Sequence, residues 1–384
     1  MHTFIKNLLN GQAVEWRTLG EVVLPTNNIK WHESDLSYRY IDLSSVDKDN
    51  NNIGETLEIT SKNAPSRAQK IVKKDDVIFA TTRPTQMRSA LIPPNLDGQI
   101  ASTGYCILRA NQNEVLPKWI YYNLQIDEFK IYLQGKQSGT AYPAISDGLI
   151  KQFQIPIPPL SVQSQIVQIL DAFTELNDQL TTELSMRQKQ YQYYRDFLLS
   201  EHELAKVGFE WKTLGKLGII NRGKRVVKSQ LTTEGVYPVY QNSLQPLGYF
   251  DKSNVKANTT FMITAGAAGE IGYSNCAFWS ADDCYYFDCP KDVLDDRFLY
   301  HSLKKQQNKI FSQVRKASIP RLGRNSVENI KIPIPPLSVQ NQIVAILDKF
   351  DHLTSSITDG LPKEIELRRK QYEHYRELLL GFDN

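Results

Sequence analysis

The side chains with the clearest chemical potential in this sequence are Arg and Lys residues gathered in a few short polar segments. Two such segments are NRGKRVVK, residues 221–228, and RKASIPRLGR, residues 315–324. Cationic side chains of this kind bind phosphate oxygens. Residues 210–331 contain 18 Lys and Arg against 11 Asp and Glu, whereas residues 15–151 contain 16 of each kind. This distribution is compatible with nucleic-acid binding by the second half, and equally with a solvated basic surface.

Sequence motifs of catalysis are missing. There is no [DN]-P-P-[YFW] tetrapeptide of adenine methyltransferases and no G-x-x-x-x-G-K-[ST] nucleotide loop. The Gly-rich run TAGAAGEIG, residues 264–272, lacks a following Gly-Lys-Ser/Thr, so we interpret it as a turn between strands. The six histidines are scattered, and none pairs with Cys or another His at metal-ligand spacing. We therefore expect no metal site and no catalysis, so that any chemistry must come from partners.

Length and composition indicate an ordinary globular protein. The chain has 384 residues, 41% of them hydrophobic and 23% charged, which is enough for two or three domains with cores of their own. No continuously apolar run approaches the roughly 18 residues of a membrane span, and the start MHTFIKNLLNGQ lacks the layout of a secretion signal. We expect a soluble cytoplasmic protein whose cysteines are reduced and packed in sheets rather than bound to metal. These cysteines are Cys106, Cys276, Cys284 and Cys289.

A seventeen-residue stretch occurs twice in the chain. IPIPPLSVQSQIVQILD at 155–171 returns as IPIPPLSVQNQIVAILD at 332–348, and the two copies differ at two positions. The repeat distance of 177 residues is too long for a solenoid unit and indicates a duplicated pair of domains. Three shorter pairs follow the same order along the chain: VEWRTLG (14–20) with FEWKTLG (209–215), WIYYNL (119–124) with FLYHSL (298–303), and RQKQYQYYRDFLL (187–199) with RRKQYEHYRELLL (368–380).

Each copy is predicted to begin with a domain of short strands and one amphipathic helix. The prolines of IPIPPL exclude this segment from a sheet ladder and from a helix interior, and make it a stiff, extended exit from the domain. Ser161 and Ser338 are the predicted N-caps of the helices that follow. The predicted strands are 75–82, 104–109, 259–265 and 284–289, and the predicted amphipathic helices are 117–134 and 296–314.

A long helix is predicted after each domain. Apolar and aromatic side chains recur at steps of mostly three and four residues over 166–198 and 343–379, which is typical of a helix that packs against one partner helix. A helix of about 40 residues is roughly 60 Å long. The simplest arrangement is an antiparallel pair with the domains at opposite ends. The second copy has four extra residues, and Gly360 and Pro362 are expected to break or kink its helix.

These patterns predict an α+β fold with a pseudo-two-fold internal repeat, in which two mixed α/β domains are joined by two long antiparallel helices. The predicted boundaries are 1–158 for the first domain, with a short N-terminal segment 1–13, then 159–205 for the first spacer helix, 206–335 for the second domain and 336–384 for the second spacer helix.

The arrangement of these motifs resembles the specificity subunit of type I restriction–modification systems. Two variable mixed domains each begin EW-K/R-TLG and end I-x-IPIPPL, and they alternate with helices that end KQY-x-x-YR-x-x-LL. The resemblance covers residues 14–381. The double occurrence of IPIPPL…QIV…ILD together with a double KQYxxYR is highly specific for this family.

The resemblance implies a non-catalytic subunit that recognises double-stranded DNA. Each domain would act as a target-recognition domain for one half of a split, asymmetric site, while the helices set the gap and dock the methyltransferase. The expected partners are two modification subunits, which methylate adenine with S-adenosylmethionine, and two restriction subunits, which use ATP and Mg²⁺ for translocation and cleavage. This chain itself is expected to carry no cofactor and to bind no membrane.

Candidate DNA contacts lie in polar loops of both domains. Most of them are expected to position the phosphate backbone and a few to read bases, the alternative for each being a solvated loop side chain. Amide side chains can bond N6 and N7 of adenine together. The candidates in the second domain are Arg222, Lys224, Arg225, Gln241, Asn242, Arg315, Lys316, Arg321 and Arg324. Those in the first are Arg83, Arg88, Lys136, Gln137, Ser138 and Tyr142, with Pro143 aligned to Pro320.

Candidate partner-docking residues lie at the aromatic and basic ends of the long helices. Tyr191 and Tyr372 fall on the apolar spacing and are predicted to close the seam between the helices. This leaves four side chains free to face outward and dock a partner: Tyr194, Arg195, Tyr375 and Arg376.

Two other function classes remain to be separated from a DNA reader. A pure scaffold predicts no DNA affinity and no salt dependence, whereas a reader predicts binding that falls steeply with salt. The recognition half of a fused restriction–methylation enzyme is disfavoured because the sequence contains no catalytic module.

Overall fold

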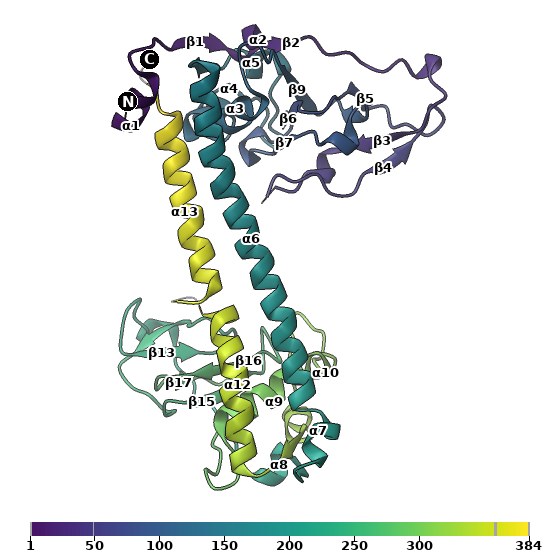
Figure 1. Ribbon diagram of the computed structural model, residues 1–384. Coiled ribbons are helices and arrows are strands. Elements are labelled where there is room, and N and C mark those ends of the chain that lie inside the picture. Colours follow the sequence, from purple (N-terminus) through teal and green to yellow (C-terminus); the bar gives the residue numbers. More distant parts are fainter. Residues whose placement is uncertain (1, 49, 357–358, 383–384) are drawn as a thin grey trace. The chain divides into compact units, whose positions relative to one another are not determined.

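The computed structural model describes residues 2–48, 50–356 and 359–382, which form two compact units of helices and sheets (Figure 1). Unit 1 consists of the described residues up to 179 together with those from 366 onward, and unit 2 of those within 180–365. The division cuts through two long helical segments. Each unit therefore contains one domain and the helical segments that pack against it.

The domain of unit 1 is mostly antiparallel sheet. Its elements are α1 Thr3–Leu9, β1 Glu15–Thr18, α2 Leu19–Val22, β2 Val23–Leu24, β3 Tyr38–Ile41, β4 Leu57–Ile59, β5 Ala68–Ile71, β6 Val77–Ala80, β7 Ser89–Leu91, β8 Ile100–Ser102, β9 Tyr105–Ala110, α3 Pro117–Asn123, α4 Asp127–Lys136, α5 Asp147–Lys151 and β10 Gln154–Ile157. One four-stranded sheet has the order β2-β9-β6-β7 and the other β4-β3-β8-β5, in which only β3 and β8 are parallel.

The domain of unit 2 has a related four-stranded sheet with the order β12-β18-β15-β16, all antiparallel, and a three-stranded sheet β14-β13-β17. The elements of this domain are α7 Glu201–Ala205, β11 Glu210–Thr213, α8 Leu214–Leu217, β12 Ile220–Arg222, β13 Tyr237–Tyr240, β14 Gly248–Phe250, β15 Thr259–Ile263, β16 Ile271–Ser274, β17 Trp279–Ser280, β18 Cys284–Phe287, α9 Asp296–Lys305, α10 Gln307–Phe311, α11 Arg324–Glu328 and β19 Lys331–Ile334. The long helices are α6 Leu160–Leu198, α12 Leu337–Ser355 and α13 Leu361–Leu380.

The four predicted strands are confirmed as β6, β9, β15 and β18, all central in their sheets. Every residue of β6 and β15 is buried, which explains their continuous apolar runs. The predicted helices at 117–134 and 296–314 each form two shorter helices instead, α3 with α4 and α9 with α10. Ile126 interrupts the first because its backbone is extended and its side chain is buried in the core. Of the cysteines, Cys276 is exposed, so the prediction of sheet packing is wrong for it.

The IPIPPL segments close each domain by pairing with its first strand. β10 pairs with β1, with Pro156 opposite Trp16, and β19 pairs with β11, with Pro333 opposite Trp211. The prediction that these prolines exclude the segment from a ladder is therefore wrong for the first proline of each copy. Each ladder has only two strands, so a residue without an N–H is tolerated where that group would face the unpaired edge.

The long helices begin directly after the last proline of each segment. Val162 N donates to Pro159 O at 2.9 Å, and Pro336 is the N-cap of α12, with φ −52° and ψ 144°. The prediction that Ser161 and Ser338 are N-caps is wrong, because both lie within the first turn. The proline ring presets φ and supplies the carbonyl that the first turn needs.

A fully buried glutamine ties each long helix to its domain. The Gln340 side chain accepts from Asp295 N at 2.9 Å and donates to the carbonyls of Val293 at 2.9 Å and Pro335 at 2.8 Å. The equivalent bonds of Gln163 involve Leu116 N, Glu114 O and Pro158 O. One side chain thus satisfies three backbone groups where loop, exit segment and helix meet.

Replacing Gln340 by leucine is expected to lower the free energy of unfolding of unit 2 by about 2 kcal/mol, because one buried N–H and two carbonyls lose their partner. Urea denaturation measures the change. The matched control is leucine at Gln342, an exposed residue two positions further along the same helix. Equal stability of the two variants would contradict the role given to Gln340.

The long helices run antiparallel within each unit. In unit 1 the start of α6 and the end of α13 share one core, and Phe173 stacks on Tyr375 with ring centroids 5.4 Å apart (Figure 1). In unit 2 the end of α6 and the start of α12 share one core, and Tyr194 stacks on Phe350, also at 5.4 Å. The phenylalanines and tyrosines of these two stacks are equivalent residues of the repeat, so the repeat extends to the helix pairing.

The predicted interruption at Gly360 and Pro362 is confirmed, because α12 ends at Ser355 and α13 begins at Leu361. A Cβ atom added at Gly360 would lie 2.7 Å from the carbonyl oxygen of His352. Only glycine fits this close approach of the chain to the end of α12.

Candidate nucleic-acid interface

The basic segments of unit 2 meet at one end of its four-stranded sheet. β12 ends at Arg222 opposite Tyr285, and β15 ends at Ile263 opposite Cys284, so the loops that follow them lie at the same sheet end. Lys224 N donates to Ser280 O at 2.8 Å, which holds the NRGKRVVK segment against this end. The sheet therefore collects loops from distant parts of the sequence.

The second basic segment of unit 2 forms a closed loop at the same sheet end. Arg315 and Arg321 exchange two backbone hydrogen bonds, 2.8 Å and 3.2 Å long, which define loop 315–321. Gly266 N donates to Pro320 O at 3.1 Å, and Leu322 N donates to Thr264 O at 2.8 Å. These bonds fasten the loop to the residues that follow β15.

Unit 1 holds an equivalent loop in the same way. Ser138 and Ala144 exchange backbone hydrogen bonds of 2.9 Å and 2.8 Å, which define loop 138–144. Arg83 N donates to Pro143 O at 2.7 Å, and Ile145 N donates to Thr81 O at 2.9 Å, just after β6. The alignment of Pro143 with Pro320 is thus confirmed by equivalent hydrogen bonds.

The two units place different side chains at the position that fastens the loop. In unit 1 this position is Arg83, whose φ of +50° is unusual for a residue other than glycine. In unit 2 it is Gly266, with φ +83°, where an added Cβ would lie 2.8 Å from the carbonyl oxygen of Asn242. In unit 2 the backbone and Cβ of Asn242, an exposed residue, therefore occupy the space that a side chain at this position would need. A guanidinium and an amide recognise different base edges.

Most predicted contact residues of unit 2 are exposed around this sheet end. Arg222, whose Nε donates to Asp282 O at 3.2 Å, is exposed, whereas Gln241 is half-buried. Arg324 is exposed but forms a 2.7 Å ion pair with Glu328. The remaining exposed members are Lys224, Arg225, Asn242, Arg315, Lys316 and Arg321.

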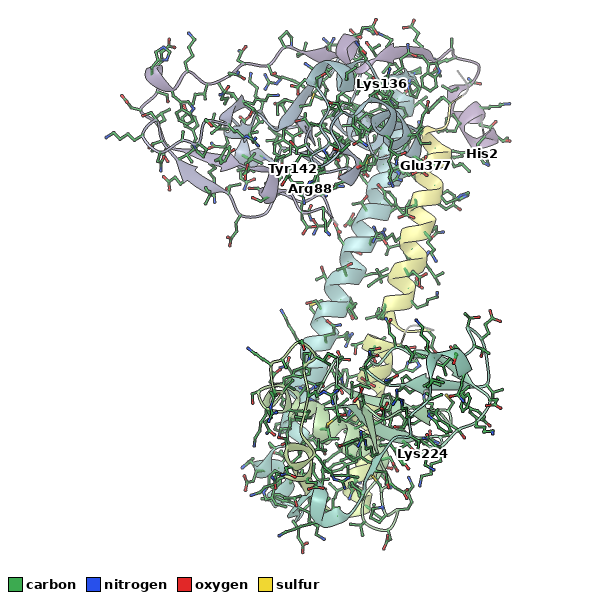
Figure 2. The ribbon with its side chains drawn as sticks, turned by 180° about the vertical axis from the view of Figure 1, so that it is seen from behind. His2, Arg88, Lys136, Tyr142, Lys224 and Glu377 are labelled. Carbon is green, nitrogen blue, oxygen red and sulfur yellow. The ribbon has the colours of Figure 1, made fainter. Side chains whose placement is uncertain are left out.

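The predicted contact residues of unit 1 divide into two groups. Arg83, Lys136, Ser138 and Tyr142 are exposed, and the Arg83 guanidinium lies 5.4 Å from the centre of the Tyr142 ring. Figure 2 labels Tyr142 and Lys136 on this unit, together with Arg88.

Arg88 and Gln137, by contrast, are engaged within unit 1. Arg88 is half-buried, and its Nη1 donates to Leu43 O at 3.0 Å. The Gln137 side-chain oxygen is buried, while its backbone N caps the end of α4. The prediction that Arg88 reaches outward to a groove is therefore wrong, because its guanidinium supports the segment after β3.

The predicted docking residues are less free than expected. Arg195 and Arg376 are only 15% and 13% exposed at their side chains, and each lies over the ring of the tyrosine one turn before it, Tyr191 and Tyr372. Tyr194 packs on Phe350. The outward orientation is thus wrong for Arg195, Arg376 and Tyr194. Tyr191 and Tyr372, predicted to close the seam between the helices, are half-buried against the two cores, and their hydroxyls contact His301 and Gln125 of the domains.

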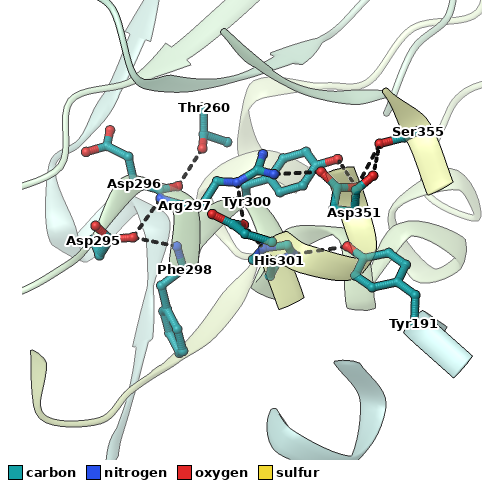
Figure 3. A network of polar contacts seen from close by, with 11 residues as sticks. Tyr191, Thr260, Asp295, Asp296, Arg297, Phe298, Tyr300, His301, Asp351 and Ser355 are labelled. Carbon is teal, nitrogen blue, oxygen red and sulfur yellow. Dashed lines mark hydrogen bonds and ion pairs between the residues drawn. The ribbon is translucent and has the colours of Figure 1, made fainter. Parts of the chain in front are cut away.

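A buried polar network joins the helices to the domain of unit 2 (Figure 3). Arg297 on α9 donates from Nε to Asp348 at 2.7 Å and from Nη2 to Asp351 at 2.6 Å, both on α12. His301 is fully buried and contacts Asp348 at 2.7 Å and the Tyr191 hydroxyl of α6 at 3.0 Å. Because a carboxylate only accepts, Nε2 of His301 donates to Asp348, and the neutral ring accepts from Tyr191 at Nδ1.

Unit 1 has an equivalent junction, in which the polar side chains of the domain bond a single aspartate of the long helix. Lys118 and Tyr122, in place of Arg297 and His301, bond the Asp171 carboxylate at 2.7 Å and 2.6 Å. Asp171 and Asp348 are the last residues of the two seventeen-residue copies. Sequence reasoning assigned no role to these aspartates or to the buried glutamines, although their identity in both copies was a usable signal.

Burial lowers the pKa of His301 below its ordinary value of 6.5, and the positive charge of Arg297 lowers it further, so that the opposing effect of the hydrogen bond to Asp348 is outweighed. Burial opposes the charged form of Asp348, but bonds from His301 and Arg297 outweigh it and hold the pKa below 3.8. Asp351 and Tyr191 also face the ring. A lowered folded-state pKa means that the unfolded state binds the proton more readily.

Unit 2 is therefore expected to lose stability as the pH falls below 6.5. The neutral His301 stabilises the fold above this pH, and the contribution disappears as the pH passes through the folded-state pKa. Urea midpoints between pH 7 and 5 should fall more steeply for the wild type than for His301→Gln. His202→Gln, at an exposed histidine of the same unit, is the control. Parallel curves for all three proteins would exclude this account of His301.

Within the described part of the chain, no three His, Cys, Asp or Glu side chains are grouped as a metal site requires. Over the same residues, no helix combines the length and apolar character that a membrane crossing needs.

Comparison with known proteins gives consistent matches over the whole chain. The model of the type I restriction modification DNA specificity domain matches twice, at residues 14–186 and 206–367. The type I restriction enzyme EcoR124I/EcoR124II specificity subunit of Escherichia coli is 31% identical over 410 residues, covering 99% of this chain and 97% of that protein.

Two solved structures have the same fold. One is a chain from a structural study of complex assembly and conformational transition of the type I R-M system. It has a TM-score of 0.61 and 25% identity, and the match covers 97% of this chain and 99% of that one. The S subunit of a type I restriction-modification system from M. genitalium has a TM-score of 0.65 at 18% identity over 98% of both chains.

Proposed function

This chain belongs to the type I restriction–modification DNA specificity family, and we propose that each of its two units reads one half of a split, asymmetric DNA target. In this family the chain has the role of a DNA-recognition subunit and not of an enzyme. The target-recognition domains are residues 1–158 and 206–335, and the helical segments 159–205 and 336–384 set the gap between the half-sites.

One observation carries this proposal. Both units hold a loop in the same hydrogen-bonded frame, yet the residues on that frame differ, with Arg83 in unit 1 and Gly266 packed against Asn242 in unit 2. A shared frame with different donors and acceptors suits two readers of the same geometry and different sequence. The exposed cations around each loop supply the phosphate contacts that place it on the duplex.

The partners follow from the same proposal. Two modification subunits dock on the helical segments and methylate adenine with S-adenosylmethionine, and two restriction subunits supply ATP- and Mg²⁺-dependent translocation and cleavage. Tyr194, Arg195, Tyr375 and Arg376 stay candidates for docking, with Tyr375 the most exposed of them at 37%. For the three more buried side chains, docking requires that the partner either covers their present contacts within this chain or replaces them with contacts of its own.

DNA binding by the complex of this chain with its modification subunits tests the proposal against a scaffold. A reader should bind duplex fragments, with a logarithm of affinity that falls linearly with the logarithm of salt concentration. A correctly assembled complex that binds no duplex at 50 to 200 mM salt, roughly the range over which such contacts weaken, would identify the chain as a scaffold.

A further inference from the structure

The two equivalent loops expose a large apolar side chain at the same position. Tyr142 in loop 138–144 is 73% exposed, and Ile319 in loop 315–321 is 54% exposed. Each directly precedes the proline that fastens its loop, and this proline is the one identity among the seven loop positions. Single exposed apolar residues are common on protein surfaces. Their recurrence at one position of two otherwise different loops is not explained by folding.

The loop frame keeps these side chains outside the core. The exchanged backbone bonds close each loop at its base, and the carbonyl after the exposed residue is bonded to the strand exit. Two residues beyond the proline, Ile145 and Leu322 are 5% and 4% exposed and fill the adjacent core positions. Tyr142 and Ile319 are thus held on the surface by a rigid anchor on their C-terminal side.

Positive charge surrounds both positions. Tyr142 lies 5.4 Å from the Arg83 guanidinium, and Lys136 is exposed just before its loop. Loop 315–321 contains Arg315, Lys316 and Arg321, all exposed. Neither loop contains an acidic residue. An exposed apolar side chain with cations close to it fits an anionic partner that also offers apolar surface, which describes the bases of DNA between their phosphates.

We infer that Tyr142 and Ile319 make the apolar base contact of each half-site, each within its own unit. This inference rests on the proposed function and adds the residue that touches the bases. The surface contacted is the apolar part of a base. It is either a ring face uncovered by opening a base step or the C5-methyl group of thymine.

The test uses the complex with its modification subunits and a duplex carrying the motif that the wild-type complex methylates. Tyr142→Ala and Ile319→Ala should each weaken binding about tenfold, the usual effect of losing one base contact. The slope of affinity against salt should stay unchanged, because no phosphate contact is lost. Ile131→Ala and Val236→Ala remove apolar side chains that are 67% and 72% exposed elsewhere in the two units, and should bind like the wild type.

Modified duplexes identify the contacted surface. If it is a thymine methyl, deoxyuridine at that position should weaken the wild type and leave the variant unaffected. If it is a ring face, 2-aminopurine at the opened step should brighten with the wild type and not with the variant.

Variants that bind like the controls would overturn the inference, as would a loss of affinity to which neither modified duplex responds. A wild-type complex that binds no DNA would instead overturn the proposed function, so the two failures are distinguishable.

Discussion

Replacing Arg297 by methionine is expected to lower the free energy of unfolding of unit 2 by about 3 kcal/mol, because it leaves the buried Asp351 carboxylate without its charged partner. The Arg297 and Asp351 side chains are 18% and 12% exposed, so water does not readily replace this pair's bond, whereas Asp348 is 39% exposed and keeps its bond from His301. The Arg297 guanidinium also lies between the Tyr273 and Tyr300 rings, 4.6 Å and 4.5 Å from their centres. Denaturant unfolding measures the loss, and hydrogen exchange of the α9 amides assigns it to this junction.

The repeat supplies a matched control in the same chain. Lys118, which takes the place of Arg297 in unit 1, pairs with Asp171 at side-chain exposures of 48% and 34%. Lys118→Met should lower the free energy of unfolding of unit 1 by less than about 1 kcal/mol, because exposed ion pairs contribute no more than this. Arg297→Lys should retain part of the stability, because the charge stays while one of its two carboxylate bonds is lost. Equal effects of the methionine variants in the two units would refute this account of the junction.

Changing Arg222, Lys224 and Arg225 together to glutamine is expected to weaken DNA binding about a hundredfold at moderate salt. Each phosphate contact that is lost should also reduce the salt slope by about one. All three side chains are exposed at the sheet end that carries loop 315–321. Fluorescence anisotropy of a labelled duplex over a salt series measures affinity and slope in one experiment.

A triple variant at Lys216, Lys252 and Lys331 controls for net charge. These exposed lysines lie in the same unit but outside the loops that meet at this sheet end, and their change to glutamine removes the same three charges. An equal loss of affinity in both triple variants would show that only the overall charge of the unit matters. The proposed interface predicts a much larger loss at 222–225.

The repeat made most of the architecture predictable. Two copies of IPIPPL followed by a helical pattern indicated two domains alternating with helices, and Gly360 and Pro362 located the interruption of the second helix. Buried strands such as β6 and β15 were found because a strand covered on both faces is continuously apolar. The starts of the two long helices were predicted one or two residues too late. Serine is a common N-cap in proteins, but here the last proline of IPIPPL precedes the first helical residue.

The site was less predictable, because side-chain direction depends on tertiary contacts. The sequence does not show that Arg88 turns inward to Leu43 O while Arg83 stays exposed beside Tyr142. The 177-residue offset aligned Pro143 with Pro320, and applying it to the preceding residue sets Ile319 opposite Tyr142. Ile319 was overlooked because an apolar residue in a basic segment was not considered as a contact.

Base-resolved mapping of N6-methyladenine shows whether the two units read separate halves of one DNA target. The chain is co-expressed with its modification subunit in a host free of DNA methylation, with residues 210–331 either native or exchanged for those of a related subunit. We expect one split motif, of which a single half changes after the exchange. A change in both halves, or no methylation from an assembled complex that binds DNA, would contradict paired reading by the two units.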